Sequence, residues 1–346
     1  MESSTEKLRV GVVGLGMGKH HIKAFEAHAR CTLAAVCDMD KDRLDWAKQE
    51  YDVPHVFTDA EEMFGSGQVD AVAIVTPNFT HHPLALSAVE HGLHVLCEKP
   101  IALNARQGGE MVEAAKRKGV TFAMHFNHRM LPQVQTMRRH VEAGTAGELH
   151  FVRTVWRRRR GIPGGATGWF SQKAKSGGGG LIDLGVHMLD IALYLMGYPK
   201  VIAAMGSTHT LFAETDKPGM DVDDFATGYL RLEGGRSIEV EISWASHHEK
   251  NEERLVAAYG DKAGLVWRTP VEDGREVRIL RREQDDLTDA TVTAFSPNHA
   301  TVQADFVDAV LDGREPKCKG EHGLTVMRIL DALYESSETG HEVAIG

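Results

Sequence analysis

Residues 8–18 read LRVGVVGLGMG, an apolar run that ends in closely spaced glycines. A run rich in valine without polar alternation is typical of a buried parallel strand, because helices cover both faces of such a sheet. The glycines allow a tight turn, and a helix is predicted to begin near Lys19. Backbone N–H groups at the start of such a helix can hold a pyrophosphate. The last glycine comes one residue earlier than in the usual G-x-G-x-x-G pattern, so the turn alone is a weak signal.

The succession of apolar run and helix recurs through the first third of the chain. More strand-like runs follow the first: Thr32–Cys37, Val69–Val75, His94–Cys97 and Thr121–Phe126. Between them lie stretches with a period near 3.6 residues: Leu44–Gln49, Leu84–His91 and Met111–Lys118. Gly92 and Gly119 stand at the expected C-terminal cap positions of two of these helices. The alternation predicts an α/β domain with a doubly wound parallel sheet of the Rossmann type over residues 1–126.

The pattern changes after about residue 148. Strand-like segments there follow one another with only turns between them: Ile238–Trp244, Arg254–Tyr259 and Val277–Leu280. Such a succession favours a large open, mostly antiparallel sheet. Helical periodicity returns at Val302–Leu311 and Leu324–Ser336. We therefore predict a second, α+β domain over residues 127–320, and leave open whether the segment from about 321 to 346 packs back on the first domain.

The composition is that of an ordinary globular protein: 346 residues, 42% hydrophobic and 25% charged, a length that suits two domains. The net charge of −10 disfavours nucleic acid or an anionic membrane as a partner, because phosphate groups attract positive fields. No unbroken apolar run approaches the roughly 18 residues of a membrane helix, and Met1–Lys7 do not resemble a secretory signal. The cysteines have neither disulfide-type nor metal-type spacing, which favours a reduced, cytoplasmic protein. They are Cys31, Cys37, Cys97 and Cys318.

Asp38 stands at the end of the second predicted strand. A carboxylate at this place can accept hydrogen bonds from both ribose hydroxyls of NAD, and it repels the 2′-phosphate of NADP. The alternative is that Asp38 caps the helix predicted from Lys41, since aspartate is a favoured N-cap residue. The two roles can also be divided between Asp38 and the nearby Asp40. We expect NAD rather than NADP as the cofactor.

Polar residues follow two more of the predicted strands. Thr76-Pro77-Asn78 with His81 comes after one, and Glu98-Lys99-Pro100 after the next. Open α/β sheets bind their ligands at the carboxyl ends of strands, which places both segments near a ligand. Lys99 is unusual, because it closes a buried apolar strand. Adjacent strand residues face opposite ways, so Glu98 and Lys99 are not expected to neutralise each other; a salt bridge from Glu98 to a neighbouring helix is the alternative.

A second-domain motif begins with the glycines Gly177–Gly180 and continues as LIDLGVHMLD over residues 181–190. The glycines let the backbone pass close to another part of the structure. In a helix that follows them, positions 183, 187 and 190 lie on one face. Asp183 can then fix the tautomer of His187 and raise its basicity, as a general base requires. We assign Asp190 mainly to structure.

The polar stripe on this helix has two other interpretations. It could be a solvated face, although its neighbours are apolar: Leu184, Val186, Met188, Leu189 and Ile191. It could also bind a metal ion, since histidine and carboxylates suit zinc or manganese. We expect no metal, because no further histidine or cysteine cluster accompanies the stripe.

Two features between residues 156 and 170 are candidates for substrate contact. Arg157–Arg160 is a run of positive charges, which is either a solvated rim or a place where Arg157 reaches an anionic substrate. Trp169 and Phe170 either stack on a sugar ring or anchor their loop by hydrophobic contact.

In combination, these motifs resemble the glucose–fructose oxidoreductase/inositol dehydrogenase/rhizopine-catabolism family, written Gfo/Idh/MocA. The tail from Asp305 through Glu321-His322-Gly323 to Val343 is similar as well, so the resemblance spans nearly the whole chain. The resemblance agrees with Asp183 and His187 as catalytic residues and with Lys99 as a donor that stabilises negative charge on the substrate oxygen. It also implies that the open face of the second sheet pairs subunits into homodimers or homotetramers.

The expected function is an NAD-dependent oxidoreductase that transfers hydride between nicotinamide and a secondary alcohol of a sugar, glycoside or cyclitol. Two alternatives stay open: redox-neutral sugar modification with tightly bound NAD, and a nucleotide-binding regulator without catalysis. The residues expected to contact the cofactor are Gly14, Gly16, Met17, Gly18, Asp38, Thr76, Pro77, Asn78, His81, Glu98, Lys99 and, by its family position, Asn127. Those expected at the substrate are Lys99, Asn127, Arg157, Trp169, Asp183 and His187.

Overall fold

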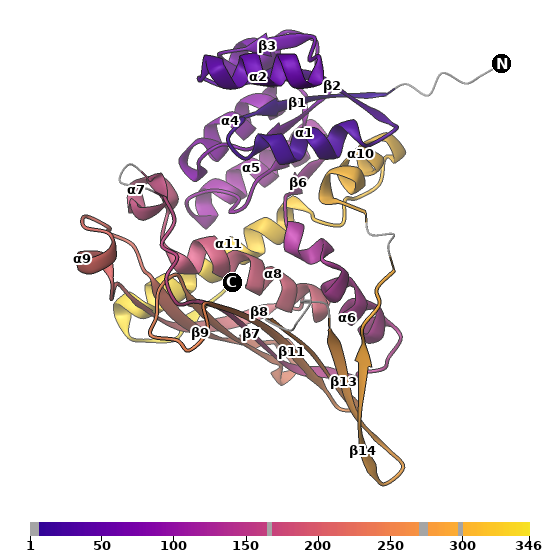
Figure 1. Cartoon of the computed structure of the whole chain (residues 1–346), viewed down its shortest axis with the longest axis vertical. Helices are drawn as coiled ribbons and strands as arrows, with labels where there is room; N and C mark the ends of the chain where they lie inside the picture. The colour runs from indigo at the N-terminus through magenta and orange to yellow at the C-terminus, as the bar shows by residue number, and fades with distance from the viewer. Residues whose placement is uncertain (1–6, 165–167, 270–275, 297–299) are drawn as a thin grey trace, which may run out of the picture. The chain divides into compact units, whose positions relative to one another are not determined.

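The computed structural model describes residues 7–164, 168–269, 276–296 and 300–346. Its chain divides into two compact units, each of which is described by itself. The first unit comprises Met1–Phe126 with Ala300–Leu324, and the second comprises Asn127–His299 with Thr325–Gly346. Helix α11 (Gly320–Thr339) continues from the first unit into the second (Figure 1).

The last part of the chain is divided between the two units. The segment that returns to the first unit is 300–324, earlier in the sequence than the 321–346 that we considered. It is held there by the Met124 N–H, which donates to the Cys318 carbonyl at 2.8 Å. The end of the chain belongs to the second unit, where β15 (Val343–Ala344) pairs antiparallel with β8 (Val201–His209).

Within its described residues, the first unit contains a six-stranded sheet in the order β3-β2-β1-β4-β5-β6, and every pairing is parallel. The strands are β1 (Leu8–Val13), β2 (Cys31–Cys37), β3 (His55–Phe57), β4 (Ala71–Ile74), β5 (His94–Cys97) and β6 (Phe122–Met124). The central strands are fully buried at Val10, Val12 and throughout β4, as expected of strands covered on both faces. The predicted Rossmann-type sheet is confirmed; the three-residue edge strand β3 was not among the predicted runs.

The helices of the first unit are α1 (Gly18–Glu26), α2 (Lys41–Tyr51), α3 (Ala60–Gly65), α4 (Asn78–Glu90), α5 (Ala105–Lys118) and α10 (Val302–Asp312). Of these, α2, α3, α5 and α10 begin at a residue whose side chain caps the helix. Asn104 accepts the Gln107 N–H at the start of α5, and Gly119 ends that helix in the left-handed conformation. The strand order reverses between β1 and β4, which in such sheets is where ligands bind.

In the described part of the second unit, a nine-stranded sheet runs in the order β14-β13-β12-β11-β7-β10-β9-β8-β15. The strands not yet given are β7 (Leu149–Arg158), β9 (Phe225–Leu232), β10 (Ser237–Ser243), β11 (Glu252–Gly260), β12 (Ala263–Thr269), β13 (Val277–Glu283) and β14 (Asp286–Val292). The helical segments are η1 (Asn127–Met130), α6 (Pro132–Glu142), η2 (Trp169–Ser171), α7 (Lys173–Ser176), the π-helical η3 (Leu181–Gly185), α8 (Val186–Leu195), α9 (Ala213–Asp216) and η4 (Glu233–Gly235). Strands β7 and β10 pair in parallel and the other described pairs are antiparallel, which confirms the predicted sheet.

Strand β7 shows how the two faces of this sheet differ. Helix α8 packs against β7, β10 and β11 (Figure 1). Trp156 of β7 pairs with Ile242 of β10 on one side and with Arg254 of β11 on the other, so these three side chains project from the same face. Ile242 packs against Gly185 of η3. These side chains therefore face the helical layer. The next residue, Arg157, projects to the opposite, open face, because successive strand residues alternate.

The stretch Lys173–Leu195 is apolar enough by length and composition to cross a membrane, although the sequence has no unbroken apolar run of that size. In the structure, 89% of its most apolar window is buried inside the fold. Burial of this kind is typical of the core helix of a globular domain. The four cysteines are free and buried.

Candidate active site

The glycine turn after β1 can accept a pyrophosphate group. Gly14 has a φ of +90°, and a Cβ there would lie 2.4 Å from the Val75 carbonyl oxygen, so no larger residue fits. The following Gly16 and Met17 are exposed, and α1 begins at Gly18. Accessible backbone at a helix N-terminus favours phosphate groups. The shortened glycine spacing thus still gives a tight turn with accessible backbone before α1, and the pyrophosphate contact stays a prediction.

Asp38 supports this turn from the end of β2. Its Oδ2 accepts the Leu15 N–H at 2.6 Å, and its Oδ1 accepts the Asp40 N–H at 2.9 Å. The N-cap of α2 is Asp40, whose carboxylate accepts the N–H groups of Asp42 and Arg43. The structure thus assigns the N-cap role to Asp40, and the ribose contact of Asp38 stays a prediction. Each Asp38 oxygen keeps lone pairs for a ribose hydroxyl, and the Arg43 guanidinium lies 3.5 Å from Oδ2.

His81 links the segments that follow β4 and β5. Its Nδ1 lies 2.8 Å from the Pro100 carbonyl oxygen and its Nε2 lies 2.9 Å from that of Thr76. Burial lowers the pKa of His81, while both carbonyls and the charge of Glu98 favour the protonated ring. The ring is fully buried, so it holds the two segments together rather than touching a cofactor. This corrects our expectation that His81 contacts NAD directly.

Lys99 follows β5 and is half-buried. Its backbone N–H donates to Glu98 Oε2 at 3.1 Å, and the Lys99–Pro100 peptide bond is cis. Glu98 forms the helix contact that we considered as an alternative, since its Oε1 lies 2.9 Å from Nε2 of His21 on α1. Asn78 is buried at the start of α4.

One group of described residues has the composition and spacing of a metal site. Nε2 of His21, Oε1 of Glu98 and Nδ1 of His125 all lie within 4.8 Å of one another. Two histidines and one carboxylate suit a divalent transition metal. The same atoms also contact one another directly, since Glu98 Oε1 lies within hydrogen-bond distance of both ring nitrogens.

In the second unit, the glycine run Gly177–Gly180 lies directly against a buried loop. A Cβ on Gly179 would meet the Asp223 carbonyl oxygen at 1.8 Å, and one on Gly178 would meet the Tyr334 hydroxyl at 2.2 Å. The Asp223 carboxylate accepts the N–H groups of Gly179 and Leu181, each at 2.8 Å. The close approach predicted from the glycines is therefore to the protein itself. It anchors the start of the helix that carries Asp183 and His187.

Asp183 and His187 stand one turn apart where the π-helical η3 passes into α8. Asp183 Oδ2 accepts the indole N–H of Trp244 at 3.0 Å, which fixes this carboxylate. His187 is only 5% exposed. Its ring stacks on His128 with centroids 4.1 Å apart and planes inclined by 17°, and His128 in turn stacks on Trp156. His187 is thus held in a fixed orientation.

Asp190 has a structural role. It forms a fully buried ion pair with Arg129, whose Nε lies 3.1 Å from Oδ2. Arg129 Nη2 also donates to the Tyr198 hydroxyl at 2.7 Å, and that hydroxyl contacts Asp190. The pair joins η1, which carries His128, to α8, which carries His187.

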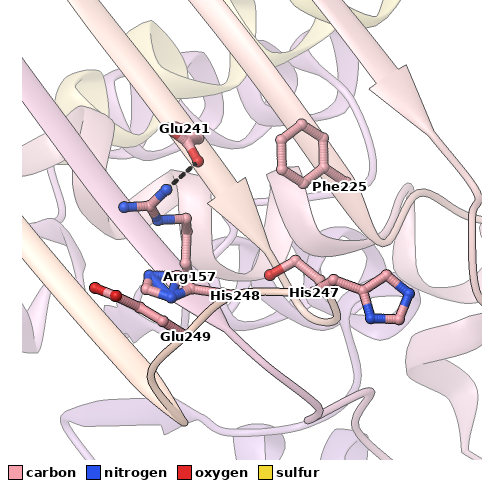
Figure 2. A pocket seen from close by; sticks show the side chains of 7 residues that line it. Arg157, Phe225, Glu241, His247, His248 and Glu249 are labelled. Carbon is pink, nitrogen blue, oxygen red and sulfur yellow. Dashed lines mark ion pairs between the residues drawn. The ribbon is translucent and has the colours of Figure 1, made fainter.

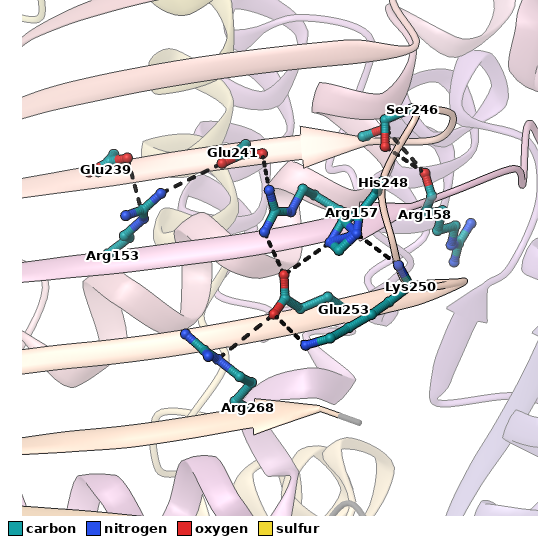
Figure 3. A network of polar contacts seen from close by, with 11 residues as sticks. Arg153, Arg157, Arg158, Glu239, Glu241, Ser246, His248, Lys250, Glu253 and Arg268 are labelled. Carbon is teal, nitrogen blue, oxygen red and sulfur yellow. Dashed lines mark hydrogen bonds and ion pairs between the residues drawn. The ribbon is translucent and has the colours of Figure 1, made fainter. Parts of the chain in front are cut away.

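Arg157 lies on the open face of the sheet, where an acidic residue holds it. Its Nη2 is 2.5 Å from Oε2 of Glu253, and its Nη1 is 3.2 Å from Oε1 of Glu241 (Figure 3). Glu253 also contacts His248 and Lys250. Burial raises the pKa of the Glu253 carboxyl, but hydrogen bonds and charges from Arg157 and Lys250 outweigh burial and lower it.

This location corrects our expectation for Arg157. Because Trp156 faces the helical layer and His187, the adjacent Arg157 must face away from them. It instead borders a shallow hollow of about 350 Å³ on the open face (Figure 2). The hollow is lined by Arg157, Phe225, Glu241, Ser246, His247, His248 and Glu249. We no longer assign Arg157 to substrate binding.

The remaining substrate candidates also lie in the second unit. Asn127 is exposed at the start of η1, next to His128. Trp169 stacks on Phe170 with centroids 3.9 Å apart, and both rings are half-buried. The mutual stacking supports anchoring of this loop, and a sugar contact stays a prediction.

Comparison with known proteins places this geometry in a family. Residues 8–126 match the model of the Gfo/Idh/MocA oxidoreductase family with its NAD-binding Rossmann fold, and residues 134–266 match the family's C-terminal domain. The chain belongs to the Gfo/Idh/MocA family. It is 29% identical to the D-glucoside 3-dehydrogenase of Escherichia coli over 99% of both chains. It is 27% identical to the myo-inositol 2-dehydrogenase of Thermotoga maritima over 98% of both chains.

A solved structure of similar fold is levoglucosan dehydrogenase in complex with NADH and levoglucosan. It superposes with a TM-score of 0.89 at 25% identity, and the match covers 98% of this chain and 100% of the other.

The Gfo/Idh/MocA motifs account for the residues that sequence reasoning selected, but the structure adds others around His187. His128 and Trp156 form the stack against which His187 lies, and Trp244 holds Asp183. Trp156 could have been selected from strand alternation, because a residue next to Arg157 must face the other side. No local pattern marks His128 or Trp244.

Proposed function

We propose that this family member is an NAD-dependent dehydrogenase that oxidises a secondary alcohol of a sugar, glycoside or cyclitol. The observation that carries the proposal is His187, a buried histidine held by a ring stack one turn after Asp183. A buried, oriented imidazole near a carboxylate suits a general base better than a surface role. The similar proteins described above are glucoside, inositol and levoglucosan dehydrogenases, and they support this substrate class.

The proposal assigns cofactor binding and Lys99 to the first unit, and Asp183 and His187 to the second. The Gly14 turn and Asp38 would hold the pyrophosphate and ribose of NAD, and the bound cofactor would supply the hydride acceptor for the alcohol carbon. His187 takes the hydroxyl proton, and Asp183 keeps the imidazole in the basic tautomer. Lys99 donates a hydrogen bond to the same oxygen and stabilises its developing negative charge.

A substrate screen tests the proposal. The purified protein is incubated with NAD and with pentoses, hexoses, glycosides and inositols, while NADH absorbance and product formation are followed. Release of NADH with a ketone product supports a dehydrogenase. A chemically modified sugar without net formation of NADH supports the alternative function, redox-neutral sugar modification with tightly bound NAD. Tight NAD binding without any turnover would favour a regulator.

Cofactor choice should depend on Asp38. We expect the wild-type protein to bind NAD at least tenfold more tightly than NADP, about 1.4 kcal/mol. Asp38→Asn removes the charge that repels the 2′-phosphate, and Arg43 stands 3.5 Å away to attract it. Fluorescence titrations of this variant should therefore show a smaller or reversed preference for NAD over NADP. In the matched variant Asp38→Asn with Arg43→Ala, the affinity for NADP should increase less than in Asp38→Asn alone. Equal affinities in the wild type would contradict the role of Asp38.

We also propose that the open face of the nine-stranded sheet joins two copies of the chain. Exposed apolar side chains stand on this face among its ion pairs, including Met205 at 54% and Tyr229 at 47% exposure. Burial of such a face on a second copy would remove this apolar surface from water. Light scattering should report a dimer or tetramer, and Tyr229→Glu should shift the mass toward the monomer. A monomeric wild type would overturn the proposal.

The buried free thiols also support a place in the reducing cytoplasm. Burial raises the pKa of Cys31 to about 11 and that of Cys37 to about 12, so both stay protonated and unreactive.

A further inference from the structure

Glu98 is surrounded by a closed set of hydrogen bonds within the first unit. Its Oε1 lies 2.9 Å from Nε2 of His21 and 2.8 Å from Nδ1 of His125. The other nitrogens of the two rings both face the amide of Gln303 on α10, His125 Nε2 at 2.9 Å and His21 Nδ1 at 3.3 Å. The two imidazole rings lie 4.2 Å apart. All of these side chains are buried or nearly so.

Only one arrangement of protons satisfies this set with neutral rings. Glu98 is an acceptor only when ionised, so Nε2 of His21 and Nδ1 of His125 must both carry hydrogen. Each neutral ring then presents an acceptor nitrogen to Gln303. The amide NH₂ of Gln303 has two hydrogens and can donate one to each ring. Every ring nitrogen of the two histidines then has a partner within the set.

We infer that Gln303 is a positioning residue that fixes the tautomers of His21 and His125, so that both rings donate to Glu98 and thereby hold Lys99. The second Glu98 oxygen accepts the Lys99 N–H, which connects the set to the backbone of Lys99. The inference rests on the proposed function only for the part that Lys99 takes in the reaction. The tautomers themselves do not depend on that function.

The pKa shifts of His21 and Glu98 agree with this arrangement. Burial lowers the pKa of His21, which favours a neutral ring. Burial raises the pKa of Glu98, but the neighbouring His125 and His21, which donate hydrogen bonds to it, outweigh burial and hold the pKa well below its usual range, which favours an ionised carboxylate. His20 and His81 are the other titratable groups that act on the cluster. On α10, Asp305 is engaged by Arg314.

The residues of this cluster are far apart in the sequence, so no local motif indicates that they lie together. Gln303 lies 282 residues after His21 and 178 after His125. It reaches them because 300–324 returns to the first unit. The return of this segment therefore brings Gln303 next to the two histidines that contact Glu98, the residue before Lys99.

The first test reads the tautomers directly. Nitrogen NMR of the full-length protein with isotope-labelled histidine should show His21 protonated on Nε2 and His125 protonated on Nδ1. The signals are assigned by their loss in His21→Gln and His125→Gln. The opposite tautomer at either ring would overturn the inference, and this holds whether or not a substrate has been found. Stoichiometric zinc in the purified protein, lost in these two variants, would also overturn it in favour of a metal site.

The second test separates positioning from stability. In Gln303→Leu, neither His21 nor His125 should be held in a single tautomer. We expect kcat to fall by about tenfold or more, because a small displacement of Lys99 from its position is costly. The KM for NAD should change by less than about twofold. Gln303→Glu keeps the shape but offers only acceptors, so the rings must bind extra protons and the pH profile of kcat should shift.

The control is Gln107→Leu, which removes another first-unit amide that holds a loop N–H at Leu103 but does not touch Glu98. It should cost stability without changing tautomers or the pH profile. If Gln303→Leu only lowers the melting temperature, as the control does, Gln303 is structural and the inference fails. If Gln303→Leu does not fold, the wild-type tautomers and Gln303→Glu still decide.

Discussion

Replacing His187 with alanine should lower kcat by roughly 10²–10⁴, the range of a general acid–base group. The proton of the substrate hydroxyl then has no acceptor of matched basicity, and the barrier rises by about 2.7–5.4 kcal/mol. The affinity for NAD should change little, because its pyrophosphate and ribose contacts belong to the Gly14 turn and Asp38. Steady-state kinetics and NAD titration on the same preparation measure both.

The pH dependence gives a second reading of the same residue. In the wild type, kcat/KM should fall as the solution becomes acidic and the base takes up a proton. In His187→Ala this acid limb should disappear. Asp183→Asn should also lower kcat, since it weakens the basicity of the imidazole and disturbs its orientation.

Two controls accompany these variants. His150→Ala removes an exposed histidine of the same unit and should leave kcat unchanged. Asp190→Asn disturbs the buried pair with Arg129 and should reduce stability more than turnover. Near-normal turnover in a well-folded His187→Ala protein would show that the base lies elsewhere.

The parts of the fold that depend on local pattern were predictable from the sequence. Buried parallel strands such as β4 lack polar alternation, and Gly14 and Gly119 mark a turn and a helix end. These signals act over a few residues, so reading them needs no knowledge of distant contacts. The short edge strand β3 lacks such a signal, since it has three residues and is only partly buried.

The parts of the site that depend on distant pairing were not predictable in this way. The sequence suggested a substrate role for Arg157, but its charge is engaged by Glu253, 96 residues away. His81 was expected at the cofactor, but both ring nitrogens face carbonyls in a buried position. Composition gives the kind of side chain, whereas the strand register decides which face it occupies.

Lys99→Met should lower kcat by roughly 10²–10³, the loss seen when one donor to a developing oxyanion is removed. Methionine is an unbranched side chain nearly as long as lysine, but it cannot donate a hydrogen bond to the substrate. The contact to Glu98 should persist, because it is made by the backbone N–H of residue 99. Lys116→Met, on an exposed position of α5, is the matched control and should leave kcat unchanged.

The double variant Lys99→Met with His187→Ala then shows whether the two residues serve one proton-transfer step. Groups that act together on one oxygen are non-additive, because the second loss removes support from a step that has already failed. We therefore expect the double variant to lose much less than the product of the single losses. Losses that multiply would mean that Lys99 and His187 act independently, and Lys99 would then serve the cofactor rather than the substrate hydroxyl.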